Sequence, residues 1–261
     1  MKSDKDLEHD RYEARARAAL AAKFESGAEA GTLPPALQAP YDRYARCIRE
    51  SIADAQTSVL EIGAGSGAFS STAVKTGARV IATDISESSL ELLRRGLGDP
   101  ANLETRVADM EALPFGDEIF DLVVCAGSLS YGENDTVMNE IYRVLKPGGR
   151  FVCVDSLDHN PVYRLNRWLH FLRGQRTRST LERMPKMRLI GAYEKKFGQA
   201  RTWYFGSIVW LAPVLGLFLS PAGVGRLCNR FDRACKVSRS AFKFVMIAKK
   251  SAAIGEPKIR V

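Results

Sequence analysis

A glycine-rich segment from residue 61 to residue 68 is the first part of the chain that could bind a ligand. It reads Glu61-Ile62-Gly63-Ala64-Gly65-Ser66-Gly67-Ala68 and lies between an apolar run and a stretch with helical spacing. Glycines at a turn from strand to helix permit a tight bend, and they let a ligand approach the backbone without Cβ atoms in the way. Asp84 closes the next apolar run, where its carboxylate could accept hydrogen bonds from both hydroxyls of a ribose. These residues predict a site for a cofactor that contains a nucleoside.

The glycines alone leave the identity of that cofactor open. Gly63-x-Gly65-x-x-Ala68 also satisfies the dinucleotide pattern, so a nicotinamide-dependent oxidoreductase is an alternative. Glu61 argues against it, because a carboxylate at this turn would repel a pyrophosphate but could serve a cationic sulfonium amino acid. Asp109-Met110 follows the third apolar run, and it adds a carboxylate able to accept from an adenine amino group and a thioether able to pack on the ring.

Seven short runs are expected to form the strands that position these residues. Five are rich in Val and Ile, and they lie at 58–62, 79–83, 103–107, 120–124 and 151–154. Most are separated by helix-length segments, which predicts a parallel sheet buried on both faces and therefore a doubly wound α/β domain. Residues 200–205 and 241–248 resemble a final hairpin of the same sheet. The expectation is a mostly parallel sheet of seven strands.

The helices and the division of the chain follow from the same patterns. Helical spacing is expected at 6–24, 40–53, 69–76 and 134–145, and Pro147-Gly148-Gly149 is expected to stop the last of these. The expected division is an N-terminal helical lid at 1–55, a cofactor-binding core at 56–156, substrate-side helices with a hydrophobic insertion and the last strands at 157–250, and a frayed tail at 251–261.

The stretch from Val59 to Val154 resembles the class I S-adenosylmethionine-dependent methyltransferases, and most closely the type that includes the ubiquinone and menaquinone biosynthesis methyltransferases. The resemblance rests on the features above and on two further segments that follow them in order, 113–123 (LPFGDEIFDLV) and 143–149 (RVLKPGG). It covers roughly 100 residues, the cofactor half, and it implies a Rossmann-like methyltransferase fold.

The resemblance also implies roles for individual residues. Glu61, Gly63, Gly65 and Gly67 would hold the methionine part of S-adenosylmethionine, Asp84 the ribose, and Asp109 with Met110 the adenine, while Ala126 and the two residues after it would border the methyl group. Asp121 would be a structural acid of the fourth strand. A non-catalytic module that binds S-adenosylmethionine is an alternative.

Methyl transfer from a sulfonium is a direct displacement, so it depends mainly on alignment of the acceptor atom. A hydroxyl or carbon acceptor must also lose a proton, and Tyr131, Asp158, His159 and His170 are the candidate bases. We select His159 and Tyr131 as catalytic candidates, because His159 follows the fifth strand on the side where open α/β sheets bind ligands. His159 could instead be an exposed loop histidine, and Asp158 could cap the helix that starts near Asn160.

Charge and composition bear on the acceptor. Residues 1–155 carry 17 Lys/Arg against 25 Asp/Glu, whereas residues 156–261 carry 21 against 5. The basic third, with five arginines among aromatics at 160–178, suits a phosphorylated or lipid-linked acceptor, although a solvated basic face is the plainer alternative. We expect O-methylation of a small-molecule, lipid-linked or glycan-type acceptor. RNA is the alternative substrate. Because no RNA-binding module accompanies the basic third, nucleic acid is not the expected partner. Five cysteines without a CxxC pair and three histidines predict no metal site.

Residues 202–225 contain no charged side chain and lie between two arginines. By length they could span a membrane, but one crossing would separate the two strands of the final hairpin. We therefore expect first a buried or lid-forming insertion, second a hairpin bent near Pro213 or Gly216 that dips into a membrane surface, and only last a span. Because the chain opens with charged residues and no apolar leader, a cytoplasmic protein is expected, with peripheral contact at the inner face of a membrane as an option.

Overall fold

The computed structural model describes residues 4–26, 33–172, 177–235 and 238–252. Its strands are β1 (Ser58–Ile62), β2 (Arg79–Asp84), β3 (Leu103–Val107), β4 (Phe120–Ala126), β5 (Leu145–Ser156), β6 (Gln199–Phe205) and β7 (Lys243–Lys249). Its α-helices are α1 (Asp4–Ser26), α2 (Pro35–Ser51), α3 (Ser71–Val74), α4 (Glu87–Leu97), α5 (Asn134–Val144), α6 (Pro161–Leu172), α7 (Arg178–Glu182), α8 (Met187–Phe197), α9 (Ala212–Leu215) and α10 (Pro221–Ala234). Most of the tail predicted to be frayed lies outside the described residues.

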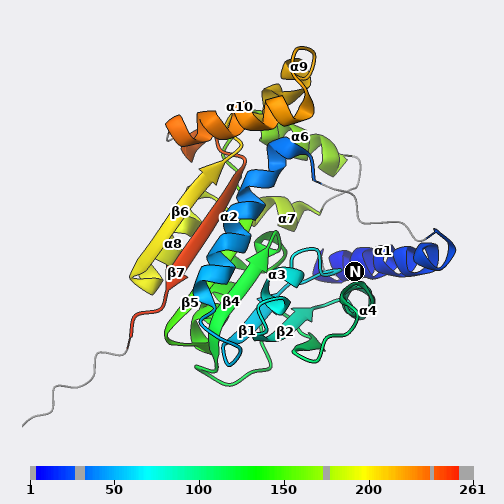
Figure 1. Cartoon of the computed structure of the whole chain (residues 1–261), viewed down its shortest axis with the longest axis vertical. Coiled ribbons are helices and arrows are strands. Elements are labelled where there is room, and N and C mark those ends of the chain that lie inside the picture. The colour runs from blue at the N-terminus through cyan, green and yellow to red at the C-terminus, as the bar shows by residue number, and fades with distance from the viewer. Residues whose placement is uncertain (1–3, 27–32, 173–176, 236–237, 253–261) are drawn as a thin grey trace, which may run out of the picture.

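The strands form one sheet in the order β3-β2-β1-β4-β5-β7-β6 (Figure 1). β1 to β5 are parallel, and β7 runs antiparallel to both of its neighbours. The predicted seven-stranded, mostly parallel, doubly wound fold is confirmed. Because the order reverses between β1 and β4, the carboxyl ends of these strands open a crevice in which such sheets bind ligands.

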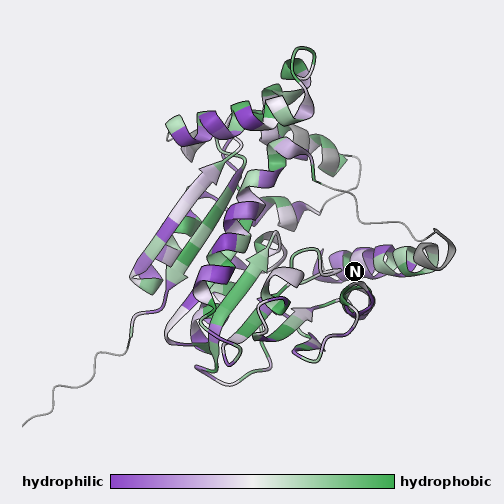
Figure 2. Cartoon of the chain, in the orientation of Figure 1, coloured by the Kyte–Doolittle hydropathy of each residue, from purple (hydrophilic) through white to green (hydrophobic). Residues whose placement is uncertain are grey.

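Apolar side chains fill both faces of the sheet. On one face, Tyr44 and Ile48 of α2 pack against Val59, Val80 and Val124. On the other, α5 and α8 contribute a second buried cluster, which includes Ile141, Val144, Tyr193 and Phe197. Figure 2 shows the same pattern, with apolar central strands and more polar outer faces on the helices that cover them.

Several element boundaries differ from the expectations. The helix expected at 69–76 is reduced to the four residues of α3, with turns on both sides. α2 begins at Pro35, so Pro40, the expected start, lies inside the helix. Pro35 suits the first position, because the N–H that a proline lacks would be unpaired there. α5 ends at Val144, and β5 already starts at Leu145, so that Pro147-Gly148-Gly149 lies within the strand.

The insertion before the last strand is neither one long helix nor buried. After β6 the chain forms a short 3-10 helix, Val209–Leu211, then α9 and α10. Leu217 and Phe218, between α9 and α10, are 77% and 82% exposed, so the expectation of a buried insertion was wrong for this part. α10 packs closely on α2, since a Cβ on Gly225 would come within 3.0 Å of the Pro35 carbonyl.

No helix in the described part of the chain is both long enough and apolar enough to cross a membrane.

Candidate active site

A cavity of about 510 Å³ opens at the carboxyl ends of β1, β2 and β4. Four loops of the sheet line it, through Gly63 to Ser66, Asp84 and Ile85, Ala108 to Met110, and Ala126 to Ser128. α1 covers it with Lys5, Glu8, Tyr12, Arg15, Ala16 and Ala19. Its volume is within the range of small-molecule sites in proteins.

The glycine turn after β1 is held against the loop after β4. Gly63 has φ +63°, and a Cβ there would lie only 2.4 Å from Ser128 Oγ, which donates a hydrogen bond to Gly63 O at 3.1 Å. Gly65, with φ +54°, has no atom within 4 Å of the position of a Cβ, so it leaves open space at the turn. Gly67 does not line the cavity, but a Cβ on it would come within 2.7 Å of Leu93 in α4. Each glycine therefore serves either close packing or access to the backbone.

Asp84 connects the glycine turn to the start of α4. Its Oδ2 accepts a hydrogen bond from Gly65 N at 2.9 Å, and its Oδ1 accepts one from Ser86 N at 2.9 Å. Burial raises the pKa of this carboxyl, while these N–H donors oppose the rise. The N-cap of α4 is Ser86, whose Oγ accepts from Ser89 N. Because a carboxylate has about four acceptor positions, Asp84 can still accept from a ribose.

Glu61 lies beneath the cavity and is almost fully buried. Its side chain is not part of the lining, and its Oε2 has no hydrogen-bond partner among the described residues. Burial raises the pKa of Glu61 to about 7, and the charge of Asp84 adds to this rise. An unpaired buried carboxylate oxygen is unfavourable unless a cation or a donor approaches it. The ammonium group of a methionine moiety would satisfy this requirement.

Asp109 and Met110 lie at the other end of the cavity. Asp109 Oδ1 accepts from Glu111 N at 2.9 Å, and its Oδ2 forms an ion pair with Lys5 of α1. Lys5 also pairs with Glu111 at 2.8 Å. An adenine amino group at Asp109 would therefore share this carboxylate with Lys5 or displace it.

α1 contributes more to the wall of the cavity than the sequence indicated. Tyr12 forms a hydrogen bond with Tyr131, and the two rings meet edge to face with centroids 5.3 Å apart. Glu13 accepts from the hydroxyls of Ser86 and Ser88 at the start of α4. The helical spacing of residues 6–24 identified the helix, but nothing local in the sequence told which surface it would cover.

The structure separates the catalytic candidates. Tyr131 lines the cavity, whereas His159 is exposed and outside it. Asp158 forms an ion pair with Arg167 at 3.2 Å and does not cap α6. The start of α6 is capped by Asn160, whose Oδ1 accepts a hydrogen bond from Val162 N. The His170 side chain lies outside the described residues.

Two further acids have structural roles around the site. Asp155, buried at the end of β5, accepts from Leu129 N at 3.0 Å and so holds the loop that carries Tyr131. Its only signal in the sequence is an acid directly after a buried run. Asp121 accepts from Ser58 N at 2.9 Å and pairs with Lys146 at 2.9 Å, at the end of the sheet opposite the cavity. No group of three or more potential metal ligands is placed together in the described residues.

Comparisons with known proteins agree with this geometry. A family described as a methyltransferase domain matches residues 60–153. A demethylmenaquinone methyltransferase from Clavibacter sepedonicus is 39% identical over 112 residues, which are 41% of this chain and 44% of that protein. A ubiquinone/menaquinone biosynthesis C-methyltransferase from Haemophilus ducreyi is 38% identical over 104 residues, 37% of this chain and 40% of that protein. The chain thus matches less than half the length of these curated relatives.

Solved structures show the same fold. A Haemonchus contortus phosphoethanolamine N-methyltransferase, bound to phosphomonomethylethanolamine and S-adenosylhomocysteine, gives a TM-score of 0.62 at 16% identity and covers 97% of this chain and 61% of that one. A geranyl diphosphate C-methyltransferase from Streptomyces coelicolor gives 0.55 at 17% identity and covers 81% of this chain and 79% of that one.

The glycine turn, the strand order and the family match together define a class I S-adenosylmethionine-dependent methyltransferase domain. Its cofactor is S-adenosylmethionine, which confirms the sulfonium favoured by Glu61 over a nicotinamide dinucleotide.

Proposed function

We propose that the whole protein is an enzyme that methylates a hydroxyl group of a small-molecule, lipid-linked or glycan-type acceptor in a biosynthetic pathway. The observation that carries this proposal is the cavity between the sheet and α1, where Asp84 and Tyr131 line a space large enough for a nucleoside. Glu61 is buried outside the lining, and its Oε2 has no hydrogen-bond partner among the described residues. S-adenosylmethionine would supply an electrophilic methyl group there.

The residues of the chain divide the work of binding and alignment. Glu61 and the backbone at Gly63 and Gly65 would hold the amino acid part of the cofactor, Asp84 the ribose, and Asp109 with Met110 the adenine. Gly67 lies outside the lining and would instead let the turn pack on Leu93. Ala126 is the last residue of β4 and lines the cavity, as Tyr131 does. It would border the methyl group of the cofactor. α1 covers the cavity, which would exclude water and strengthen the electrostatic interactions within it.

Tyr131 is the better-placed catalytic candidate. Its hydroxyl pairs with that of Tyr12, and both residues line the cavity, so the pair could orient an acceptor hydroxyl and pass its proton outward. His159 could act only after a rearrangement that brings it from the surface to the cavity.

Carbon methylation is a second candidate, favoured by the names of the two relatives at 38% and 39% identity. A hydroxylated quinone ring would need the same positioning and the same loss of one proton. The family match covers residues 60–153 and not the helices beyond β5, which would contact the acceptor.

The test is incubation with methyl-labelled cofactor and cell extract, followed by separation into lipid, polysaccharide, small-molecule and nucleic-acid fractions. The labelled product is then treated with a reagent that cleaves methyl ethers. We expect label in the lipid, polysaccharide or small-molecule fraction that is released by this treatment. Label retained on carbon would favour the second candidate, label in RNA alone would contradict both, and transfer to no fraction would favour a non-catalytic binding module.

We also propose that the protein is cytoplasmic and touches the inner face of a membrane through residues 202–225. Support comes from the exposed apolar side chains at the turn between α9 and α10, and from exposed Leu165, Trp168 and Leu172 on α6. Figure 1 shows α6, α9 and α10 gathered at one end of the molecule. An apolar surface of this kind beside basic residues is typical of interfacial binding.

A further inference from the structure

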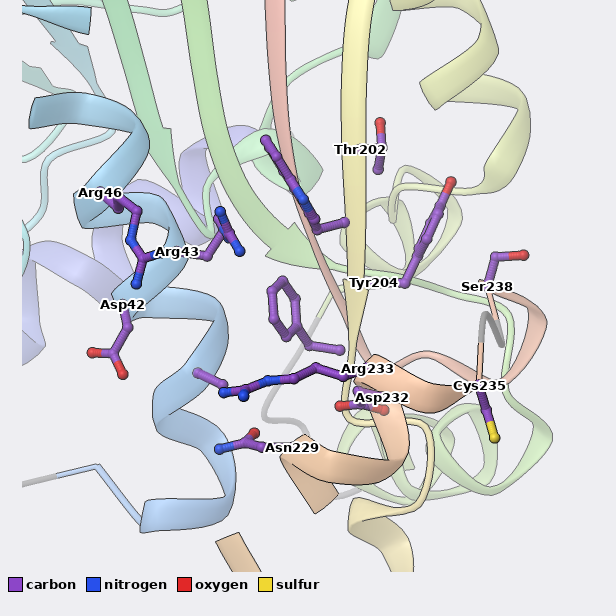
Figure 3. Close-up of a pocket in the computed structure, with 13 residues that line it drawn as sticks. Asp42, Arg43, Arg46, Thr202, Tyr204, Asn229, Asp232, Arg233, Cys235 and Ser238 are labelled. Atoms are coloured by element: carbon purple, nitrogen blue, oxygen red, sulfur yellow. The ribbon is translucent and has the colours of Figure 1, made fainter. Parts of the chain in front are cut away.

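A second cavity, of about 660 Å³, lies between α2, the edge strand β6 and α10 (Figure 3). Its lining includes Arg43 and Arg46 from α2, Trp203 and Phe205 from β6, and Arg233 from α10. None of its lining residues also lines the cofactor cavity. It is therefore a separate site, and the methyltransferase chemistry gives it no role.

Arginine side chains reach this cavity from two sides. Figure 3 shows Arg43 and Arg46 extending from α2 and Arg233 from α10, on the side of β6 opposite to Thr202 and Tyr204. The Arg43 guanidinium lies 4.8 Å from the centre of the Trp203 ring, and that of Arg201, on the same strand, lies 4.7 Å from it. Both guanidinium groups therefore contact the same tryptophan ring, which helps to hold Arg43 at the wall of the cavity.

The cavity lining contains three arginines and two acids, and the acids are held by other partners. Asp232 accepts from Gly206 N at 2.7 Å and from Ser207 N at 3.1 Å, which fixes its carboxylate against the loop after β6. Asp42 is exposed and accepts from Gln38 at 3.1 Å. Within the described ranges, neither acid forms an ion pair with Arg43, Arg46 or Arg233. Guanidinium groups that converge in this way are suited to bind phosphate oxygens in pairs.

The surroundings of the cavity indicate where such a phosphate comes from. A shallower hollow on α10 shares Asn229 and Arg233 with the cavity and adds Arg226 and Arg230. These arginines follow α10 back toward the exposed Leu217 and Phe218 that precede it. Figure 2 shows this change from a polar α10 to an apolar α9. A basic helix that continues into an exposed apolar turn matches a surface of anionic lipid, with charges at the headgroups and apolar side chains below them.

We propose that the cavity between α2, β6 and α10 binds the phosphate group of an anionic phospholipid at the membrane surface. This inference rests on the membrane contact proposed above and gives it a specific headgroup site; it does not depend on methyl transfer.

The experiment measures, by calorimetry, the binding of a short-chain phosphatidylglycerol below its micelle-forming concentration. This probe does not require the apolar turn to enter a bilayer. We expect the wild-type chain to bind it and the combined Arg43→Gln, Arg46→Gln and Arg233→Gln variant to lose affinity by at least about tenfold, since each change removes a charge-assisted hydrogen bond. Arg49→Gln is the matched control, because Arg49 is also exposed on α2 but does not line the cavity, and its affinity should equal that of the wild type.

The inference would be overturned by undiminished lipid binding of the triple variant or by equal losses in the Arg49→Gln control. It would also be overturned if inorganic phosphate bound as tightly as the lipid, which would indicate a soluble phosphate ligand. Binding of the wild type to phosphatidylglycerol vesicles without any binding of the short-chain lipid would also reject the cavity, while leaving the membrane contact in place. Affinity of the wild type for S-adenosylhomocysteine, measured on the same preparation, tests the methyltransferase proposal separately.

Discussion

Glu61 is the residue for which we propose a contact with the cationic end of the cofactor. The residue is 3% exposed, one of its carboxylate oxygens has no hydrogen-bond partner in the described structure, and burial raises its pKa to about 7. Without a ligand it is therefore partly neutral at physiological pH. A cationic ligand would favour the ionised form, so that binding and deprotonation are linked.

Glu61→Gln should separate binding from stability. We expect affinity for S-adenosylhomocysteine to fall by about tenfold or more, because the variant loses a charged acceptor. The wild-type folded pKa lies above the value of 4.5 for an ordinary glutamic acid, so ligand-free wild type should lose stability as pH rises from about 4.5 through about 7. The variant should lack this loss. Thermal unfolding from pH 5 to pH 8 checks it, and equal pH profiles for the two proteins would contradict the role of Glu61.

Wild-type binding of S-adenosylhomocysteine should also weaken as pH falls below about 7, where Glu61 becomes protonated. Calorimetry in buffers of different ionisation enthalpy should show proton release near pH 7. An affinity that is constant from pH 6 to pH 8 would mean that Glu61 does not contact the ligand.

Tyr131 and His159 offer a direct comparison of two candidates. Tyr131→Phe should lower kcat by about a hundredfold, the usual lower range for loss of a proton-transfer group, while affinity for the cofactor product changes little. His159→Ala should leave kcat nearly unchanged, because its side chain is exposed outside the cavity. A large loss of kcat in His159→Ala with little change in Tyr131→Phe would contradict this assignment. It would show that the loop after β5 rearranges during turnover.

α1 is joined to the rest of the site by polar contacts of its N-terminal half, from Lys5 to Glu13. Burial alone would raise the pKa of Glu13, but donors from Ser86 and Ser88 lower it to about 2. This contact therefore contributes stability above pH 4.5, and the contribution is lost as pH falls toward 2. Lys5 and Tyr12 add their contacts with Asp109 and Tyr131.

Glu13→Gln should loosen α1 without affecting the sheet. Amide hydrogen exchange in α1 should become about tenfold faster, since the variant removes a charged acceptor shared by two serines. Exchange in β1 and β4 should not change. Arg17→Gln is the control, because it removes only the exposed partner of the same glutamate. Equal effects of the two variants would assign the attachment to the ion pair.

Some elements could be predicted from sequence and others could not, for physical reasons. β1 and β2 were placed to within one residue, because buried strands give short apolar runs. β3 was also placed correctly, although it is an edge strand with exposed side chains. The glycine turn and Asp84 were also found from the sequence, because the turn directly follows β1 and Asp84 ends β2. The positions of Lys5 and Tyr12 over the cavity depend on how α1 docks, which local spacing does not encode. The short α3 shows that a helical pattern can be cut back by the turns around it.

The whole molecule has two ends with different character. The cofactor cavity lies under α1, and α6, α9 and α10 form the end with exposed apolar side chains and arginines (Figure 1). The split in charge between the two parts of the sequence predicted two zones, and residues 202–225 were correctly identified as apolar. That Leu217 and Phe218 would lie at an exposed turn depends on how α10 packs against α2, which sequence patterns do not show.

Leu217→Ser combined with Phe218→Ser should reduce cosedimentation with phosphatidylglycerol vesicles by about tenfold or more, because two side chains that would enter the bilayer become polar. The unfolding temperature should change little, since both side chains are exposed. Val107→Ser is the matched control, as an exposed apolar residue on β3. If the control weakens sedimentation equally, the apolar turn is not the membrane contact.

The most direct test of the central claim is a crystal structure of the protein grown with S-adenosylhomocysteine. The ligand should lie between the sheet and α1, with its amino acid end toward Glu61 and Gly63, its ribose on Asp84 and its adenine beside Met110. Electron density for the ligand at any other place, or an unchanged cavity under saturating ligand, would contradict the account.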